Sequence, residues 1–495
     1  MNPDVEPLPT NQKTAPDDWP DPTRWRILTV LLTALFMSLV SVSIVNVALP
    51  AIQQGLNASQ SNIQWVLSGY ALTFGVILVS AGRAGDIMGR GGLFLAGVVV
   101  FTAASIGAGL APSAPWLNVA RFLQGLGSGL LSPQGIGMIQ QYFRGAERGR
   151  AFGYLGTAVG FSVAVGPALG GLLIQLGGPD MGWRLTFLIN VPVGLATIVL
   201  GWLWFPRPLI TWPKKRNPAG ASKHQGLLAS LDPVGALLLG LAVLAVLFPF
   251  MESRTTPLTW VLLPTGLALA YVWVKWERRH ARLGGSPMVD LSIFSIRSFT
   301  NGTLIMTMYF LGMTSVWVLI ALYVQMGTGR SAFQAGLFGI PAALLSAYAA
   351  NWAGRRVLQY GRRIVIGGLL LAILGLGLSI AVALLYEQGL ASVWWLLLTL
   401  SFIGVAQGLV ISPNQTLTLM DVPLAYAGSS GAIMQTGQRI GSSIGIAVIT
   451  AAMFTALSAT HSWTLAVVVG FIVVTLVMFA TLYVAIKDHK GRVQP

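Results

Sequence analysis

The chain has no cysteine and few charged residues. Its 495 residues include 30 Lys and Arg but only 15 Asp and Glu, so 9% of the chain is charged, against about 25% in an ordinary soluble domain. The absence of cysteine excludes disulfides, thiolate metal sites and thiol catalysis. With 54% hydrophobic residues, the composition also excludes a disordered, collagen-like or ordinary water-exposed chain. Most of the surface must therefore face something other than water.

Long apolar runs take the place of the missing charges. No charged residue occurs from Ile27 to Gly82, a stretch that holds two apolar runs of about 20 residues, each long enough to cross a ~30 Å hydrocarbon core as a helix. We therefore predict an all-α membrane protein with fourteen transmembrane helices. Their approximate ranges are 25–49, 63–82, 92–112, 115–140, 151–176, 184–205, 231–251, 257–275, 298–324, 333–353, 363–386, 391–417, 427–457 and 463–486.

The distribution of basic residues orients these helices. With the amino terminus inside, 25 of the 30 Lys and Arg fall on the inner side, three fall outside, and Arg121 and Arg439 lie within spans. Because cytoplasmic loops are enriched in Lys and Arg, we expect both termini in the cytoplasm. The first residues lack the apolar core and cleavage site of a signal peptide. The net charge of +15 is thus interpreted as a signature of membrane topology rather than of nucleic-acid binding.

Two inner loops repeat one pattern of glycine and arginine. Residues 82–90 follow the second span and residues 354–362 follow the tenth, and both read Gly-Arg, five residues, Gly-Arg. Parallel repeats around a midplane site are typical of transporters. The alternative interpretation is a single bundle in which the two loops match by chance. The predicted segments are a disordered cytoplasmic tail (1–24), an amino-terminal six-helix bundle (25–206), a basic linker (207–230), two inserted helices (231–276), a second linker (277–297), a carboxy-terminal six-helix bundle (298–487) and a cytoplasmic tail (488–495).

Glycine patterns predict close packing of two spans. In the fifth span these glycines are Gly160, Gly166 and Gly170, and because Pro167 lacks the N–H of the helix ladder we expect a kink there. Glycines recur at four-residue spacing in the thirteenth span, at Gly437, Gly441 and Gly445. Such residues let backbones approach closely. We interpret the two spans as helices that slide or bend against each other during gating, with static packing as the alternative.

These motifs, in this order, resemble the major facilitator superfamily, and specifically its fourteen-span drug:proton antiporter family, over about residues 25–486. The first span carries the family signature at 44–50. The loop after the second span departs from the superfamily motif at Ile87 and Gly91, where basic residues are usual. The resemblance implies the major facilitator fold, in a 6 + 2 + 6 arrangement, and drug export linked to protons. The other matching residues are Gly82, Asp86, Gly89, Arg90, Arg121, Gln124, Gly125, Gly127, Gly166, Pro167, Gly170, Gly171, Trp183, Arg184, Phe187, Asn190, Pro192 and Gly194.

Asp86 and Arg90 are the predicted gating pair. A carboxylate at the inner ends of the second and third spans can meet a helix amino terminus or an arginine and hold one conformation closed. The resemblance implies the amino terminus of the thirteenth span as the partner, while a role in topology alone is the alternative. The full set of predicted gating residues is Gly82, Asp86, Gly89, Arg90, Gly166, Pro167, Gly170 and Gly171.

The predicted membrane interior holds two arginines and no central acid. A charge there costs about 2.5–3.5 kcal/mol and usually faces a cavity, although each arginine can instead lock helix packing. The resemblance implies a role for Arg121 in coupling or substrate binding, and it places a titrating aspartate where Ser41 stands. A serine does not titrate near neutral pH, so Asp86, Glu147 or Asp232 would have to supply proton coupling. The predicted substrate-binding and coupling residues, whose amides and hydroxyls could also simply join helices, are Ser41, Ser43, Asn46, Arg121, Gln124, Asn414, Gln435, Gln438 and Arg439.

Together these features predict a secondary exporter of lipophilic or amphipathic small molecules, such as drugs and antibiotics, that works by alternating access and is linked to protons. The alternative is a translocator of lipids or anionic amphiphiles without conventional proton coupling, which Ser41 favours. The sequence shows no metal cluster, no nucleophile with a base and no ATPase motif. We therefore predict no enzymatic activity, no cofactor, no ATP use and no nucleic-acid partner. We expect a monomer in the cytoplasmic membrane of a bacterium, in contact with lipids, its substrate and protons.

Overall fold

The computed structural model describes residues 23–211, 231–252, 257–283, 285–330 and 332–493. Within these ranges every regular element is helical, which confirms the predicted all-α class. The α-helices are α1 (Thr23–Gly55), α2 (Gln60–Met88), α3 (Arg90–Gly109), α4 (Ala114–Tyr142), α5 (Gly145–Leu188), α6 (Asn190–Trp204), α8 (Pro233–Glu252), α9 (Leu262–Arg282), α10 (Arg297–Leu322), α11 (Ala332–Leu337), α12 (Gly339–Tyr360), α13 (Arg362–Glu387), α14 (Leu396–Leu419), α15 (Ala427–Thr460) and α16 (Trp463–Val493). Short helical turns are η1 (Pro257–Val261), η2 (Leu291–Ser295), η3 (Tyr323–Gly327), η4 (Val393–Trp395) and η5 (Leu424–Tyr426).

Twelve helical segments of the described chain are long and apolar enough to cross a membrane. Helices α4 and α12, both predicted as spans from the sequence, do not meet that criterion. Helix α4 is not apolar enough because it contains Arg121 and four glutamines. Most of α4 is nevertheless buried among other helices, so its polar residues face protein rather than lipid.

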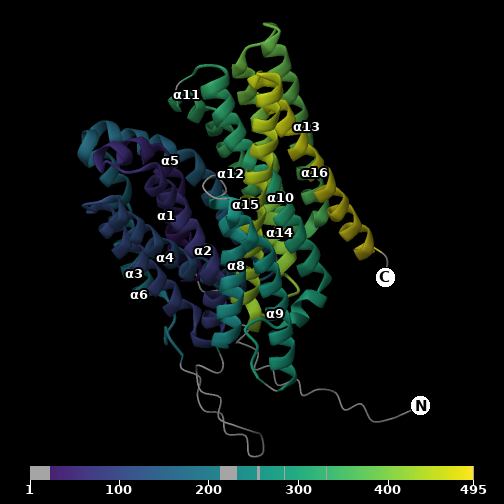
Figure 1. Cartoon of the computed structure of the whole chain (residues 1–495). Helices are drawn as coiled ribbons and strands as arrows, with labels where there is room; N and C mark the ends of the chain where they lie inside the picture. Colours follow the sequence, from purple (N-terminus) through teal and green to yellow (C-terminus); the bar gives the residue numbers. More distant parts are fainter. Residues whose placement is uncertain (1–22, 212–230, 253–256, 284, 331, 494–495) are drawn as a thin grey trace, which may run out of the picture.

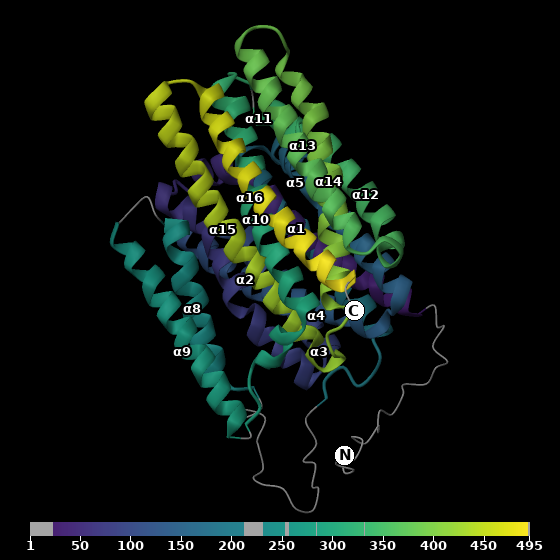
Figure 2. The ribbon, with the colours of Figure 1, turned by 90° about the vertical axis from the view of Figure 1, so that its right-hand side faces the viewer.

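The helices form two bundles that stand side by side. One bundle contains α1 to α6, and the other contains α10 to α16 (Figure 1). The two inserted helices, α8 and α9, pack against each other at the flank, where α8 contacts α2 of the first bundle and α15 of the second (Figure 2). The inserted pair therefore touches both bundles.

The repeated Gly-Arg pattern corresponds to two equivalent helix joints. Gly89 is the single residue between α2 and α3, and Gly361 is the single residue between α12 and α13. Their φ angles are +99° and +53°, a left-handed region in which a side chain would be strained. An arginine begins the following helix in both cases, Arg90 in α3 and Arg362 in α13.

The two bundles meet closely at the end of the molecule that contains these joints, which we call the Asp86 end. Helix α2 contacts α15, and α5 contacts α12. A Cβ atom on Gly82 would lie 2.6 Å from the carbonyl oxygen of Gly428, and one on Gly149 would clash with that of Gly354. Only glycine allows such close approach of the backbones. The repeat therefore extends to the bundle interface, where its two copies make similar contacts.

Several predicted boundaries and contacts differ from the structure. Helix α16 runs to Val493, so the predicted tail at 488–495 begins inside a helix. Helix α9 likewise extends to Arg282, into the predicted linker at 277–297. Helix α5 has non-helical dihedral angles at Gly178, where a kink separates the predicted fifth and sixth spans. Residues 1–22 of the predicted tail and 212–230 of the predicted linker lie outside the described residues.

The glycines of α5 and α15 pack against other helices rather than against each other. Gly166 and Gly170 face Ser43 and Ile44 of α1, whereas Gly160 faces Ala343 of α12 in the opposite bundle. The α15 glycines face α10, at Thr307 and Leu311. The expectation that α5 and α15 slide against each other is therefore wrong, because neither set of glycines lies against the other helix.

Candidate functional site

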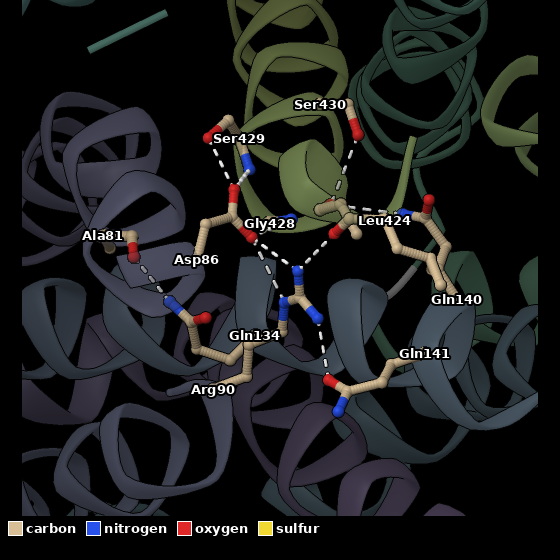
Figure 3. Close-up of polar contacts among 11 residues, drawn as sticks. Ala81, Asp86, Arg90, Gln134, Gln140, Gln141, Leu424, Gly428, Ser429 and Ser430 are labelled. Carbon is tan, nitrogen blue, oxygen red and sulfur yellow. Dashed lines mark hydrogen bonds and ion pairs between the residues drawn. The ribbon is translucent and has the colours of Figure 1, made fainter. Parts of the chain in front are cut away.

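Asp86 joins the two bundles by capping a helix of the opposite bundle. Its carboxylate accepts hydrogen bonds from the backbone N–H of Gly428 at 2.8 Å and from the N–H and hydroxyl of Ser429 at 2.9 and 2.7 Å (Figure 3). Both N–H groups belong to the first turn of α15, where the helix itself offers them no acceptor. The positive end of the helix dipole also favours a carboxylate at this place.

Arg90 extends this contact from α3. Its guanidinium donates to Oδ1 of Asp86 at 2.7 Å, to Oε1 of Gln141 at 2.7 Å and to the carbonyl of Leu424 at 2.8 Å (Figure 3). The side chains of Asp86 and Arg90 are 1% and 10% exposed. Because both charges are largely withdrawn from water, they depend on this set of partners, several of which belong to the other bundle.

Glutamines and a serine of α4 complete the contact between the bundles. The Gln140 amide donates to the carbonyl of Ala427 at 3.1 Å, and the Ser132 hydroxyl donates to Oε1 of Gln435 at 2.7 Å. Gln134 instead binds within its own bundle, at the carbonyl of Ala81. The Asp86 end is thus closed by polar contacts on α15 and by glycine contacts between α5 and α12.

A cavity lies between the bundles, directly behind these contacts. Its volume is about 260 Å³, and residues of α1, α2, α4, α5, α10, α14 and α15 line it. The wall is mainly aromatic and aliphatic, with Phe74, Tyr309 and Trp317 among its larger side chains. Such a chamber, apolar with a few polar groups, is typical of sites for small lipophilic ligands.

One face of α15 contributes four polar residues to the cavity wall. Gln435, Gln438, Arg439 and Ser442 all line the cavity, and their spacing of three and four residues places them on one face of the helix. Arg439 is the only basic residue in the described lining, which contains no acid. Its guanidinium lies 4.4 Å from the ring centre of Phe74, and no hydrogen bond joins it to a described side chain or carbonyl.

Arg121 and Gln124 lie behind the cavity wall. Arg121 is 1% exposed, and it donates to the carbonyl of Val66 at 2.8 Å and to Oε1 of Gln124 at 2.9 Å. Gln124 in turn donates to the hydroxyl of Ser105 at 2.7 Å. The guanidinium lies 4.4 Å from the ring centre of Tyr70, a residue that does line the cavity. In this conformation, Arg121 therefore supports the wall and does not face the chamber.

The remaining predicted binding residues also lie away from the chamber. Ser43 donates to the carbonyl of Ser162 in α5 at 3.1 Å, and the exposed Asn46 bonds its own helix. Ser41 is fully buried with no partner for its hydroxyl among the described residues. Asn414 accepts from Arg362 and donates to the carbonyl of Gly302. Of the nine predicted residues, the structure brings only Gln435, Gln438 and Arg439 to the cavity.

A hydroxyl cluster beside the cavity was not among the predicted site residues. The hydroxyls of Ser38 and Tyr70 lie 3.0 Å apart, and that of Ser128 is 2.7 Å from each of them. These residues belong to α1, α2 and α4, so no local spacing relates them. The stacking of Tyr70 on Phe74 did have a sequence signal, because two aromatic residues four apart share a helix face.

Comparison with known proteins places this architecture in a family. The family described as Major Facilitator Superfamily matches residues 31–446. A probable actinorhodin transporter of Streptomyces coelicolor is 33% identical over 442 residues, which are 88% of this chain and 73% of that protein. The tetracenomycin C resistance and export protein of Streptomyces glaucescens is 29% identical, over 86% of this chain and 75% of that protein.

A similar fold is found among solved structures. The crystal structure of the human organic anion transporter MFSD10 superposes with a TM-score of 0.66, covering 94% of this chain and 100% of that one, at 14% sequence identity. At this identity the likeness concerns the fold alone.

Proposed function

The chain belongs to the major facilitator superfamily, and from that membership we propose that it is a secondary exporter of lipophilic or amphipathic small molecules, of the kind that includes antibiotics. The names of its relatives support this proposal, since they include an antibiotic transporter and an antibiotic resistance and export protein. We propose that the substrate is moved unchanged, so that catalytic residues, a cofactor and ATP are not needed.

The observation that carries the proposal is a chamber closed at one end by contacts between the bundles. The Asp86–α15 cap is the polar seal of that end, and the cavity lies directly behind it. Alternating access requires such a chamber, with seals that can open when the bundles rock against each other. Hydrogen bonds across the bundle interface are suited to this task because they can be exchanged for water.

We propose that α4 and α12 also span the membrane, which brings the total to fourteen spans, and that the Asp86 end faces the cytoplasm. Basic residues support this orientation, because Arg83, Arg90, Arg144 and Arg355 lie at that end. In this orientation the present conformation is sealed toward the cytoplasm. We propose that the protein works as a monomer, since one chain supplies both bundles.

The cavity chemistry favours a neutral or anionic substrate. Arg439 faces the chamber without an acid in the described lining. An organic cation would therefore meet a like charge without a counter-charge, whereas a carboxylate or phenolate could bind the guanidinium directly. Arg439, Gln435 and Gln438 are the proposed substrate contacts.

We propose that export is linked to protons, with a translocator of lipids or anionic amphiphiles without conventional proton coupling as the second candidate. The acid-free cavity and Ser41 favour the second candidate. Purified protein in liposomes can separate the two. A lipophilic anionic dye should accumulate only under an imposed pH gradient if the first is correct. Accumulation that follows only the dye's own gradient would favour the second, and no transport of neutral or anionic compounds would contradict both.

A further inference from the structure

Two buried carboxyl groups lie together at the base of the inserted hairpin. Asp232 precedes α8 and is 2% exposed, while Glu277 lies near the end of α9 and is 1% exposed. A Cβ atom on Gly235 would lie 2.8 Å from Oε1 of Glu277 and would also clash with Oδ2 of Asp232. The two carboxyl groups therefore share the space beside this glycine.

Asp232 is surrounded by donors that favour its charged form. The indole N–H of Trp276 lies 3.0 Å from Oδ1 and 3.1 Å from Oδ2, and the backbone N–H of Gly235 donates to Oδ1 at 3.0 Å. Asp232 thus also caps the start of α8. A carboxylate that accepts several N–H bonds is stabilised as the anion.

Glu277 has the opposite surroundings. Both of its oxygens are buried without a hydrogen-bond partner among the described residues. The backbones of Met288 and Val289 and the indole of Trp273 are close to it, but their contacts lack hydrogen-bond geometry. No cation of the described chain forms an ion pair with either acid. Two adjacent buried carboxylates cannot both be ionised without a large cost.

We propose that Asp232 and Glu277 form a proton-binding site in which Asp232 is the anion and Glu277 holds the proton, and that this proton stabilises the closed Asp86 end. The inference rests on the proposed alternating-access function for its effect on the gate. The proton site itself does not depend on that function.

The short segment after α9 connects the carboxyl pair to the closed Asp86 end. Met288 and Val289 lie against Glu277, and the Ser80 hydroxyl of α2 contacts Sδ of Met288 at 3.8 Å. The next residue, Asp290, accepts a hydrogen bond of 2.8 Å from the Tyr426 hydroxyl, just before α15. The segment thus touches α2 and the start of α15, the two elements that the Asp86 cap joins. Loss of the Glu277 proton would place two anions side by side and displace this segment.

Other titratable groups lie near the pair, and their pH responses have to be distinguished from that of the pair. The His280 ring stacks on Trp276 with centroids 5.8 Å apart. Lys275, Arg278 and Arg279 are exposed on α9. Arg83 of α2 faces Asp290, and Tyr426 binds the same acid. His280→Gln is therefore the matched control.

The proton can be detected without any transport. Infrared difference spectra of the purified full-length protein, recorded between acidic and alkaline pH, should contain a protonated carboxyl band at neutral pH that is lost in Glu277→Gln and retained in His280→Gln. Glu277→Asp should keep the band but shift its titration midpoint. This second variant keeps the test decisive if Glu277→Gln fails to fold. A spectrum unchanged by Glu277→Gln would overturn the proposal.

The effect on the gate can be followed in the same protein, because the chain has no cysteine. Spin labels at Ala146→Cys and Asp421→Cys, two exposed positions at the Asp86 ends of α5 and α14, report the distance between the bundles. Raising the pH should lengthen this distance in the wild type and in His280→Gln, and should have no effect in Glu277→Gln. Absence of a pH response in the wild type, or a normal response in Glu277→Gln, would refute the link to the gate. Failure of liposome export with the infrared result intact would refute only the proposed function.

Discussion

Arg362 and Asp488 form a buried ion pair inside the second bundle. Nε of Arg362 lies 2.6 Å from Oδ2 of Asp488, and the two side chains are 1% and 0% exposed. Asn414 accepts a hydrogen bond from the same guanidinium, and the Asn301 amide donates a hydrogen bond of 2.7 Å to Oδ1 of Asp488. Arg362 holds the place in the repeat that Arg90 holds in the first bundle. The final arginine of the first copy therefore contacts the opposite bundle at Leu424, whereas that of the second copy binds within its own bundle.

Breaking this ion pair should destabilise the protein strongly. Arg362→Met or Asp488→Leu would remove one member of this buried pair, at a cost of about 3–5 kcal/mol. The double variant should recover most of the loss, since no uncompensated charge remains. Thermal unfolding in detergent measures both effects. Single variants as stable as the wild type would show that the pair is not a lock.

Removal of the charge of Asp86 should open the gate. Asp86→Asn keeps the size of the side chain but loses its interaction with the α15 dipole and with Arg90, a change of about 1–2 kcal/mol. We expect an increase of roughly five- to thirtyfold in the open population. The measurement is labelling of Thr314→Cys in the cavity from the Asp86 side, with the exposed Asp421→Asn as the control. Equal labelling rates in the two variants would argue against the gate.

Arg439→Gln should weaken the transport of anions selectively. A charge-assisted hydrogen bond to the substrate contributes about 1.5–3 kcal/mol, so KM for an anionic substrate should rise about tenfold or more. A neutral analogue of the same size should be transported normally and serves as the internal control. The exposed Arg355→Gln is the matched variant. A similar loss for both substrates would indicate that Arg439 stabilises the wall instead.

Arg121 should contribute to stability rather than to substrate binding. Arg121→Met would leave the carbonyl of Val66 and the amide oxygen of Gln124 without their donor. We expect this to lower the free energy of unfolding by about 1.5–3 kcal/mol. We expect a lower unfolding temperature with KM unchanged for the protein that folds. A variant of normal stability that no longer transports would instead assign Arg121 to coupling.

Asp290 should contribute stability that is lost only in acid. Burial opposes the charge of this carboxyl, but hydrogen bonds from Ser292 and Tyr426, together with Arg83, hold its pKa below the ordinary value. A depressed pKa gives stability that is complete above about pH 3.9, the ordinary pKa, and lost as the pH falls through the lower folded value. The difference in unfolding temperature between wild type and Asp290→Asn should therefore be constant near neutral pH and vanish in strong acid. A constant difference throughout would exclude this role.

Local features of the fold were predictable because they depend on local rules. Long apolar runs predicted the helices, since only helices satisfy the backbone in lipid without neighbouring strands. The Gly-Arg pattern predicted equivalent loops, and Gly89 and Gly361 are equivalent joints because both adopt a positive φ. Helix ends were less predictable. Asp488, placed in a tail by its charge, is buried in α16 because Arg362 compensates it.

The site was less predictable than the fold. The contact of Asp86 with α15 spans 342 residues, so it came from the family resemblance and not from any spacing within the chain. Ser38, Tyr70 and Ser128 belong to three different helices, and no pattern in one helix connects them. The role of the inserted helices could not be predicted either, because Asp232 and Glu277 come together only when α8 packs on α9.

By itself, the sequence determined that this is a helical membrane protein with a repeated plan and with arginine, rather than acid, inside its spans. Only the tertiary structure decided which arginine faces the chamber. Arg121 and Arg439 both lie within predicted spans, yet one is covered by Val66, Gln124 and Tyr70 and the other lines the cavity. Helical periodicity shows which residues share a face, but not what that face meets. That depends on packing between helices far apart in the chain.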